Sequence, residues 1–296
     1  MCDMKKLHFI INPVAGNGKA AGIWKKLKLK LDPAGMDYSS YETLYPGHAS
    51  ELTLQCISEG ADIIVAVGGD GTAYEVAQNL IGTGIPFGII PAGTGNDFIK
   101  SLKLPADPSE ILDLIMRSDP TTVDAGSING RVFINVCGIG FDVSVLEHSL
   151  KAKKFFKGMI PYLWGVIKTI VHYCPADISL TIDGKHILSR KVLVCSVANG
   201  IYIGGGMAIS PESVINDGML DIVVIEDVSR LRMIGYLPGL LGGRILTFKD
   251  TTSYKGTLVS ISSASGLKLN VDGEIVPYDK ADFRVIPGGL RVFCRL

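Results

Sequence analysis

The feature that most constrains this chain is a set of three glycine-rich loops, each of which directly follows a short apolar run. The apolar runs are residues 7–11, 62–67 and 87–90, and the loops are residues 12–19, 68–72 and 91–98. Amphipathic stretches lie between these units, so strands alternate with helices. Such alternation predicts a parallel sheet covered by helices on both faces. Because the carboxyl ends of parallel strands meet at one edge, we expect the three loops to converge there.

The rest of the chain has a different pattern, which begins at about residue 121. Asn-Gly at 129–130 and Asp-Gly at 183–184 separate strand-like flanks, as is typical of two-residue hairpin turns. We therefore predict an α/β domain over residues 1–122 and a mainly antiparallel β domain over residues 123–288. The last strand-like run, residues 289–296, is a candidate for completing the first domain.

The charge balance excludes one class of function. The 296 residues include 29 basic and 29 acidic side chains, so the molecule lacks the overall positive field of a protein that coats nucleic acid. We expect no nucleic-acid partner, and any attraction to an anionic surface must be local.

Cysteine spacing and hydropathy bear on the compartment. The six cysteines contain no CxxC pair, so the sequence predicts neither a zinc site nor a disulfide framework, but reduced thiols in the cytosol. No run approaches the ~20 apolar residues that a membrane span needs, and the N-terminus does not resemble a signal sequence. We expect a cytoplasmic protein that binds membranes at most peripherally.

The loop at residues 68–72, Gly-Gly-Asp-Gly-Thr, carries the strongest chemical signal. Its glycines let the backbone approach a ligand, and the free N–H groups at the start of the following helix attract phosphate. A carboxylate beside a polyphosphate needs a cation between them, so Asp70 indicates Mg²⁺ bridging to a nucleotide. The alternative is a tight turn with Asp70 as a helix cap.

Several motifs together resemble a known family, the diacylglycerol and sphingosine kinase catalytic domain, with flanks similar to its soluble bacterial branch. The motifs are Asn12-Pro13 with Gly16, Gly47-His48-Ala49, residues 68–72, residues 93–98, residues 138–142, Ser210-Pro211 with residues 217–221, and residues 271–274. The resemblance implies a nucleotide-binding α/β domain, a C-terminal antiparallel β-sandwich domain for the lipid acceptor, and an active site between them.

The resemblance also implies binding residues. Those implied for ATP are Asn12, Pro13, Val14, Ala15, Gly16, Thr43, Gly68, Gly69, Asp70, Gly71, Thr72, Glu75 and Thr94. Asn96 and Asp97 would lie near the acceptor. A structural Mg²⁺ would be bound by the Asp217 carboxylate with the carbonyls of Val214 and Met219, although the residues by themselves favour a simple hairpin turn at Asp217 and its glycine.

The acceptor proton must be removed during phosphoryl transfer, and Asp272 and Glu274 are the candidates for the base. They flank Gly273 in a turn, where the resemblance places the base without deciding between them. With Asp70, they form the predicted catalytic set.

A basic stretch beside an apolar run suggests membrane contact. Lys151, Lys153, Lys154 and Lys157 precede the aromatic-rich run of residues 159–170, inside a helical pattern that we predict over residues 151–173. Such a segment suits an anionic membrane surface. The alternative is a helix packed on the β domain with solvated lysines. A second helical pattern, residues 230–246, is open to the same two interpretations.

The function predicted from these features is an ATP- and Mg²⁺-dependent lipid kinase of phospholipid biosynthesis, with diacylglycerol converted to phosphatidic acid as the leading reaction. Two alternatives stay open. One is an enzyme like NAD kinase, which shares the Gly-Gly-Asp-Gly-Thr loop, and the other is a nucleotide-gated lipid-binding module without turnover. The sequence does not distinguish a monomer from a homodimer.

Overall fold

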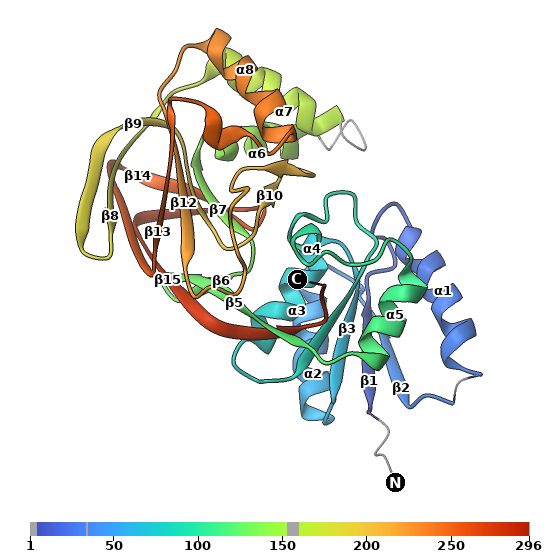
Figure 1. Cartoon of the computed structure of the whole chain (residues 1–296). Coiled ribbons are helices and arrows are strands. Elements are labelled where there is room, and N and C mark those ends of the chain that lie inside the picture. The colour runs from blue at the N-terminus through green and yellow to red at the C-terminus, as the bar shows by residue number, and fades with distance from the viewer. Residues whose placement is uncertain (1–4, 34, 153–159, 296) are drawn as a thin grey trace. The chain divides into compact units, whose positions relative to one another are not determined.

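The computed structural model describes residues 5–33, 35–152 and 160–295, and the chain forms two compact units (Figure 1). The first unit comprises Met1–Asp124 with Gly288–Leu296, and the second comprises Ala125–Pro287. These divisions lie beside the boundaries predicted after residues 122 and 288. The two-domain architecture with an antiparallel C-terminal part agrees with the sequence prediction.

The first unit is built on the strands β1 (Leu7–Ile11), β2 (Tyr38–Glu42), β3 (Ile63–Gly68) and β4 (Pro86–Pro91). They lie in the order β4-β3-β1-β2, and each neighbouring pair is parallel. Every residue of β1 and β3 is buried, which explains why both are nearly uniform apolar runs.

Helices supply the contacts that bury these strands. The helices are α1 (Lys19–Leu31), α2 (His48–Ser58), α3 (Asp70–Leu80), α4 (Asp97–Ser101) and α5 (Pro108–Arg117). Helices α1 and α5 contact each other and share one apolar core with the strands, while α2 contacts α3 and β1. At α5, Asp107 accepts a hydrogen bond from the Ser109 N–H and Pro108 occupies the first turn, so this helix begins with a complete N-cap.

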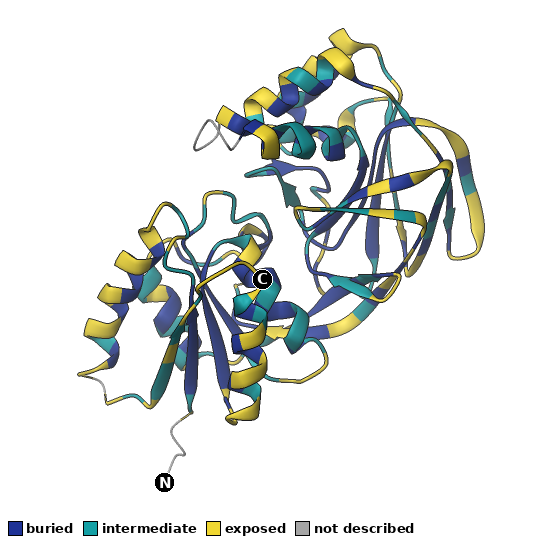
Figure 2. Cartoon of the chain, turned by 180° about the vertical axis from the view of Figure 1, so that it is seen from behind, coloured by how far each residue is buried: buried dark blue, intermediate teal, exposed yellow. Residues whose placement is uncertain are grey.

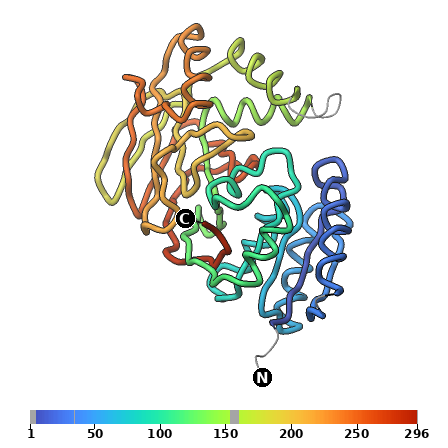
Figure 3. Tube along the Cα trace, turned by 45° about the vertical axis from the view of Figure 1, so that its right-hand side comes forward, coloured from blue at the N-terminus to red at the C-terminus, as the bar shows by residue number. Residues whose placement is uncertain are grey.

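The end of the chain completes the first sheet (Figure 3). The strand β15 (Glu274–Val292) is 19 residues long, and its last part pairs in parallel with β4 through Arg291 and Val292. Phe293 is buried in the same core as α1 and α5. The first unit is therefore made from both ends of the chain.

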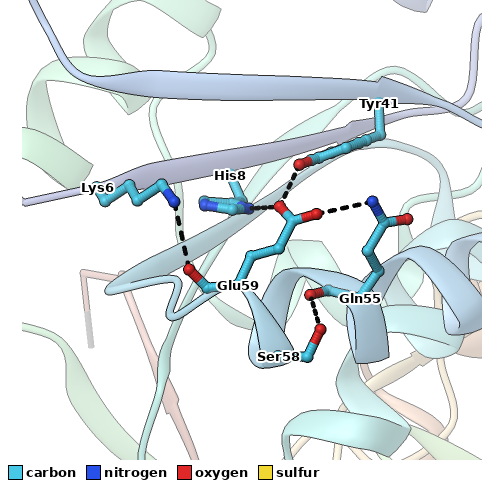
Figure 4. A network of polar contacts seen from close by, with 6 residues as sticks. All are labelled: Lys6, His8, Tyr41, Gln55, Ser58 and Glu59. Atoms are coloured by element: carbon cyan, nitrogen blue, oxygen red, sulfur yellow. Dashed lines mark hydrogen bonds and ion pairs between the residues drawn. The ribbon is translucent and has the colours of Figure 1, made fainter.

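A polar network surrounds His8, the only polar residue of β1 (Figure 4). Its Nδ1 lies 3.7 Å from Oε2 of Glu59, which also accepts a hydrogen bond from the Tyr41 hydroxyl. Burial lowers the pKa of His8 and Glu59 partly opposes that effect. The network thus ties the end of α2 to β1 and β2.

The second unit consists mainly of antiparallel strands. They are β5 (Thr121–Ile128), β6 (Arg131–Phe133), β7 (Val136–Gly140), β8 (Ala176–Ile182), β9 (Lys185–Ala198), β12 (Leu220–Glu226), β13 (Thr251–Gly256), β14 (Leu258–Val271) and the first part of β15, with a small ribbon of β10 (Tyr202–Ile203) and β11 (Met207–Ala208). The first halves of β9 and β14 pair with β8, and their second halves pair with β7. Long strands that change partner in this way produce two layers around one apolar core.

Three helices and a short 3-10 turn interrupt these strands: α6 (Phe141–Ala152), α7 (Ile160–His172), α8 (Arg230–Leu241) and η1 (Ile245–Thr247). The predicted helical stretch over residues 151–173 is thus represented by the end of α6 and by α7, with residues 153–159 outside the described part. Helices α7 and α8 contact each other, and a second apolar core lies beneath α8 and η1. None of the described helices is long and apolar enough to cross a membrane.

Candidate active site

The three glycine-rich loops of the first unit meet at the carboxyl ends of β1, β3 and β4. The Asn12 amide donates to Thr72 Oγ1 at 3.1 Å, and the Ala92 N–H donates to the Gly68 carbonyl at 2.7 Å. A Cβ on Gly93 would lie 2.6 Å from the Gly69 Cα, so this approach requires glycine. The structure therefore brings together the loops that the sequence predicts to converge.

Asp70 begins α3 within this cluster and is partly buried. Its Oδ1 is buried and has no hydrogen-bond partner among the described residues. Burial raises the pKa of the Asp70 carboxyl and the nearby Asp97 charge raises it further, while backbone N–H groups of residues 96–98 lower it. A buried carboxylate oxygen without a partner is unfavourable unless a cation or a donor approaches it.

Two further oxygens of the cluster share this condition: Oδ1 of Asn12 and Oδ1 of Asn96 are buried and lack partners in the described chain. Oxygen atoms of this kind are the ligands that Mg²⁺ prefers. Among the described residues, no group of three or more His, Cys, Asp or Glu side chains forms a ready metal site. The donor set fits an ion that takes part of its coordination from a nucleotide's phosphates and from water.

Other residues implied for ATP surround the same loops. The Thr43 N–H donates to the Ile11 carbonyl at 2.8 Å, which places Thr43 at the end of β1. Val14 and Thr94 are exposed on their loops, Pro13 and Ala15 lie on the loop of Val14, and Gly71 lies in the first turn of α3. Gly16 has φ +60°, and a Cβ there would lie 2.0 Å from the Ala92 carbonyl oxygen.

Glu75 makes contacts that the sequence did not predict. Its Oε1 accepts from the Gly47 N–H at 2.9 Å and its Oε2 from the Ala49 N–H at 3.1 Å. Both carboxylate oxygens thus satisfy donors at the N-terminus of α2, and Glu75 holds that helix against α3. Asp97 begins α4, is 13% exposed, and lies 3.6 Å from the Lys100 ammonium.

In the second unit, Asp272 and Glu274 lie on the same turn but have different surroundings. The Asp272 carboxylate accepts hydrogen bonds from the N–H groups of Ile134, Asn135 and Val136 at 2.7, 3.1 and 3.0 Å. Glu274 is 60% exposed and forms an ion pair with Arg131. Asp272 therefore anchors the turn, while Glu274 is the more accessible of the two carboxylates.

Asp142, which belongs to the motif at residues 138–142, supports this turn through Asn270. Its Oδ2 accepts from the Asn270 amide at 3.4 Å, and Oδ1 of Asn270 accepts from the Gly273 N–H at 2.9 Å. Burial raises the pKa of Asp142 to about 6. The sequence feature that could have pointed to this contact is Gly138, because a Cβ at that position would lie 1.8 Å from the Asp142 carboxylate.

The residues implied for a structural Mg²⁺ lie on one loop before β12. Asp217 accepts from the Met219 N–H at 3.1 Å and from the Lys255 ammonium at 2.6 Å, and Val214 is exposed nearby. Lys255 also lies 3.5 Å from the buried Asp221. One carboxylate with main-chain carbonyls suits a hard cation, but Lys255 already balances the charge of this carboxylate.

The proposed basic segment is described only in part. Lys151 is exposed at the end of α6, and the other three predicted lysines, Lys153, Lys154 and Lys157, lie outside the described residues. Within the apolar run, Val166 is buried, whereas Leu163, Trp164 and Ile167 are exposed. The run therefore both packs on the unit and presents an apolar face.

Comparison with known proteins supports the family resemblance. The model of the diacylglycerol kinase catalytic domain matches residues 6–128, and that of the YegS C-terminal NAD kinase beta sandwich-like domain matches residues 135–294. A diacylglycerol kinase of Bacillus subtilis (strain 168) is 27% identical over 92% of this chain and 90% of its own length. A probable lipid kinase YegS-like of Pseudomonas putida is 30% identical over 83% and 81%.

A solved structure shows the same architecture. A putative diacylglycerol kinase from Bacillus anthracis str. Sterne matches with a TM-score of 0.78 and 26% identity, over 99% of this chain and 97% of that one. Agreement at that level extends over both units. This chain belongs to the diacylglycerol kinase catalytic-domain family, in the bacterial branch that carries the YegS-type C-terminal domain.

Proposed function

We propose that this chain is an ATP- and Mg²⁺-dependent lipid kinase that phosphorylates diacylglycerol to phosphatidic acid. The observation that carries the proposal is the unpartnered, buried Oδ1 of Asp70 at the meeting point of three glycine-rich loops. A catalytically idle turn would gain nothing from such a carboxylate, whereas a site for a metal-bound triphosphate requires one. Family membership and the names of the relatives support the same class of reaction.

In the reaction, the loops around Asn12, Gly69 and Gly93 bind and orient the triphosphate through backbone N–H groups. Mg²⁺, when bound, neutralises charge on the phosphate oxygens. Asp70, with the amide oxygens of Asn12 and Asn96, would hold that ion directly or through water. Asp97 and Asn96 orient the acceptor hydroxyl.

The acceptor oxygen forms a bond to the γ-phosphorus while the bond from that phosphorus to the bridging oxygen of ADP breaks. We assign the proton of the acceptor hydroxyl to Glu274, because this carboxylate is 60% exposed and, within the described part of the chain, contacts Arg131 through an ion pair. Asp272 is less suited, since three backbone N–H groups occupy its oxygens and stabilise its charged form. Its role is to fix the turn that carries Glu274.

The proposal includes the setting of the reaction. A lipid acceptor is delivered by a membrane, so we propose a cytoplasmic protein that contacts membranes peripherally. The residues of the Asp217 loop are proposed as a second Mg²⁺ site with a structural role, in competition with Lys255.

The test is incubation of the full chain with γ-labelled ATP, Mg²⁺ and a total lipid extract, followed by identification of the labelled lipid. We expect label in phosphatidic acid, and purified diacylglycerol should give the same product. In a parallel incubation with NAD as the only acceptor, transfer of the label to NAD would establish the NAD kinase alternative. Nucleotide binding by calorimetry without transfer to either acceptor would establish the non-catalytic alternative.

A further inference from the structure

The outer face of α7 carries a continuous apolar stripe. Its members are Ile160, Leu163, Trp164, Ile167 and Val171, each between 47% and 59% exposed. Their spacing of three or four residues places them on one side of the helix over three turns. Figure 2 shows exposed segments along α7 and along its neighbour α8. Single exposed apolar residues are ordinary, but a contiguous stripe of this kind marks an interaction surface.

The stripe cannot turn inward, because the opposite face of α7 is fixed by close packing. A Cβ on Gly165 would lie 2.3 Å from Ser149 Oγ and 2.6 Å from the Val145 carbonyl oxygen, so α7 and α6 approach closely there. Buried Thr169 donates to the Gly165 carbonyl and lies 3.2 Å from His148 Nδ1. The exposed position of the stripe is therefore a property of the packed helix pair.

The contacting helix α8 has the same character. Leu231 and Ile234, three residues apart, and Leu241 near its end are 84%, 51% and 71% exposed, while Met233 and Tyr236 bury the other side. Two neighbouring helices of one unit thus present large aliphatic side chains to the outside.

The charges on these helices identify the partner. Neither Ile160–His172 nor Arg230–Leu241 contains an Asp or Glu, and their charged side chains are Lys168, Arg230 and Arg232, of which Arg232 forms an ion pair with Asp250. The Lys168 ammonium lies 5.4 Å from the centre of the Trp164 ring, beside the stripe. A second copy of the chain would bring like charges together, whereas an anionic bilayer accepts both the cations and the apolar side chains.

We infer that the α7 stripe inserts into the headgroup and upper acyl region of an anionic membrane leaflet, with α8 lying on the same membrane. This inference names the partner surface of the proposed lipid kinase and rests on that function for its purpose, but its test does not depend on turnover. Insertion of the α7 stripe differs from the electrostatic attraction expected of the lysines in residues 151–157, because the free energy of membrane binding would come from burying apolar surface.

Trp164 is a built-in probe for the test. The chain has two tryptophans, and Trp24 is buried in the core of the first unit, so vesicle-induced changes in emission report on Trp164. With vesicles of phosphatidylcholine containing phosphatidylglycerol, we expect a blue shift and quenching by lipids brominated in the upper acyl chain. A Trp164→Phe variant should lose both signals. Unchanged emission of the wild-type chain at saturating vesicle concentration would overturn the inference.

A paired substitution measures the energetic role of the stripe. We expect Leu163→Ser with Ile167→Ser to weaken vesicle partitioning at least tenfold, because two exposed aliphatic side chains lose their place in the membrane. The matched control is Leu29→Ser with Leu54→Ser, which are 74% and 55% exposed on helices of the other unit and should partition like wild type. Melting temperatures of both variants establish that they fold.

Two further outcomes separate the inference from its rivals. Equal vesicle partitioning by the stripe variant and the wild-type chain would contradict the inference. It would also be contradicted if the wild-type chain sedimented as a dimer and bound no vesicles, while the stripe variant sedimented as a monomer. Phosphoryl transfer to a short-chain, water-dispersed acceptor should be retained by the stripe variant. Loss of transfer in wild type itself would instead count against the proposed function.

Discussion

Gly138 provides the space that the carboxylate of Asp142 occupies: a Cβ at position 138 would lie 1.8 Å from Asp142 Oδ2. Gly138 pairs with Asn270 across β7 and β14, so the carboxylate lies against the residue that holds the Gly273 N–H. The missing side chain on one strand therefore allows a buried contact that ends at the turn carrying Asp272 and Glu274.

The first prediction concerns this space. Gly138→Ala should destabilise the protein by roughly 1–3 kcal/mol, because the Asp142 carboxylate must move away from Asn270. In an Asp142→Ala background the same substitution should cost much less, a coupling that denaturant titration of the double-mutant cycle measures. Gly22→Ala on α1, where a Cβ meets nothing within 4 Å, is the control and should not destabilise. Equal effects in both backgrounds would contradict this account.

The second prediction concerns the pH dependence of Asp142. Because burial raises the pKa of this carboxyl from 3.8 to about 6, the folded state holds its proton more tightly than the unfolded state. At low pH the carboxyl is protonated in both the folded and the unfolded state, so it does not change the free energy of unfolding. As pH rises from about 4 to above 6, the unfolded state loses this proton more readily, and the free energy of unfolding of the wild-type protein falls. Asp142→Asn removes the effect, so the variant should gain roughly 3 kcal/mol relative to wild type across that window.

Asp183 provides the control with the opposite sign. The Leu258 N–H lowers the pKa of its carboxyl, and a Thr257 hydroxyl and N–H act in the same direction. Asp183→Asn should therefore lose stability relative to wild type as pH rises through the region below about 4, and this deficit should stay constant between pH 4 and pH 6. Denaturant midpoints of both variants at several pH values test this, and parallel curves for the two would refute the assignments.

The third prediction concerns Asp70. Asp70→Asn should abolish kinase activity, because it removes the charge proposed to hold Mg²⁺ at the nucleotide. It should not lower the melting temperature, since burial already disfavours the charged form. Asp119→Asn, at an exposed position of the same unit, is expected to change neither quantity. Wild-type turnover by folded Asp70→Asn would exclude the metal-linked role.

The fourth prediction separates the two carboxylates of the turn. Glu274→Gln should lower kcat by roughly 10²–10⁴-fold with little change in stability, because it removes a base from the surface. Asp272→Asn should destabilise by roughly 2–3 kcal/mol, since three backbone N–H groups lose a charged acceptor. Glu226→Gln is the matched control, a 42% exposed carboxylate of the same unit that is likewise paired with an arginine, Arg190.

The measurement for this pair is kcat beside ATP affinity and melting temperature for each variant. ATP affinity should be retained by Glu274→Gln because the loops proposed to bind the nucleotide lie in the first unit. Near-native turnover by Glu274→Gln would place the base elsewhere.

The fifth prediction concerns the Asp217 loop. Lys255→Met leaves the carboxylates of Asp217 and Asp221 without their cation, so Mg²⁺ should raise the melting temperature of this variant more than that of wild type. Asp217→Asn in the same background should lose the response. If Mg²⁺ and chelator leave all three melting temperatures unchanged, the loop is a turn and not a metal site.

Local pattern predicted much of the fold. The buried run of residues 62–67 and its glycines correspond closely to β3 (Ile63–Gly68) and the start of α3, because uniform apolar runs and glycines act within a few residues. Helix α6 was not predicted, apart from its last two residues, which fall in the helical stretch predicted over residues 151–173. Within the predicted helical stretch over residues 151–173, the described residues form the end of α6 and α7, and the buried side of α7 is set by the close packing at Gly165.

The partners of the site residues lay beyond sequence reasoning. Asp272 is held by N–H groups 136 to 138 residues earlier in the chain, and Glu75 by N–H groups of a different helix. Such contacts depend on register between distant elements, which spacing along the chain does not encode. The sequence could therefore point to Asp272 and Glu274 as a pair, but it could not show that Asp272 anchors the turn while Glu274 is the accessible carboxylate.

The return of β15 to the first unit has a consequence for synthesis on the ribosome. The N-terminal sheet lacks its last strand, and its core lacks Phe293, until residues 291–293 have left the exit tunnel. The second unit, whose residues are contiguous, is complete earlier than the first. Nascent-chain experiments should therefore find that protease resistance of the N-terminal sheet arrives last, and that a fragment ending at Asp124 remains aggregation-prone.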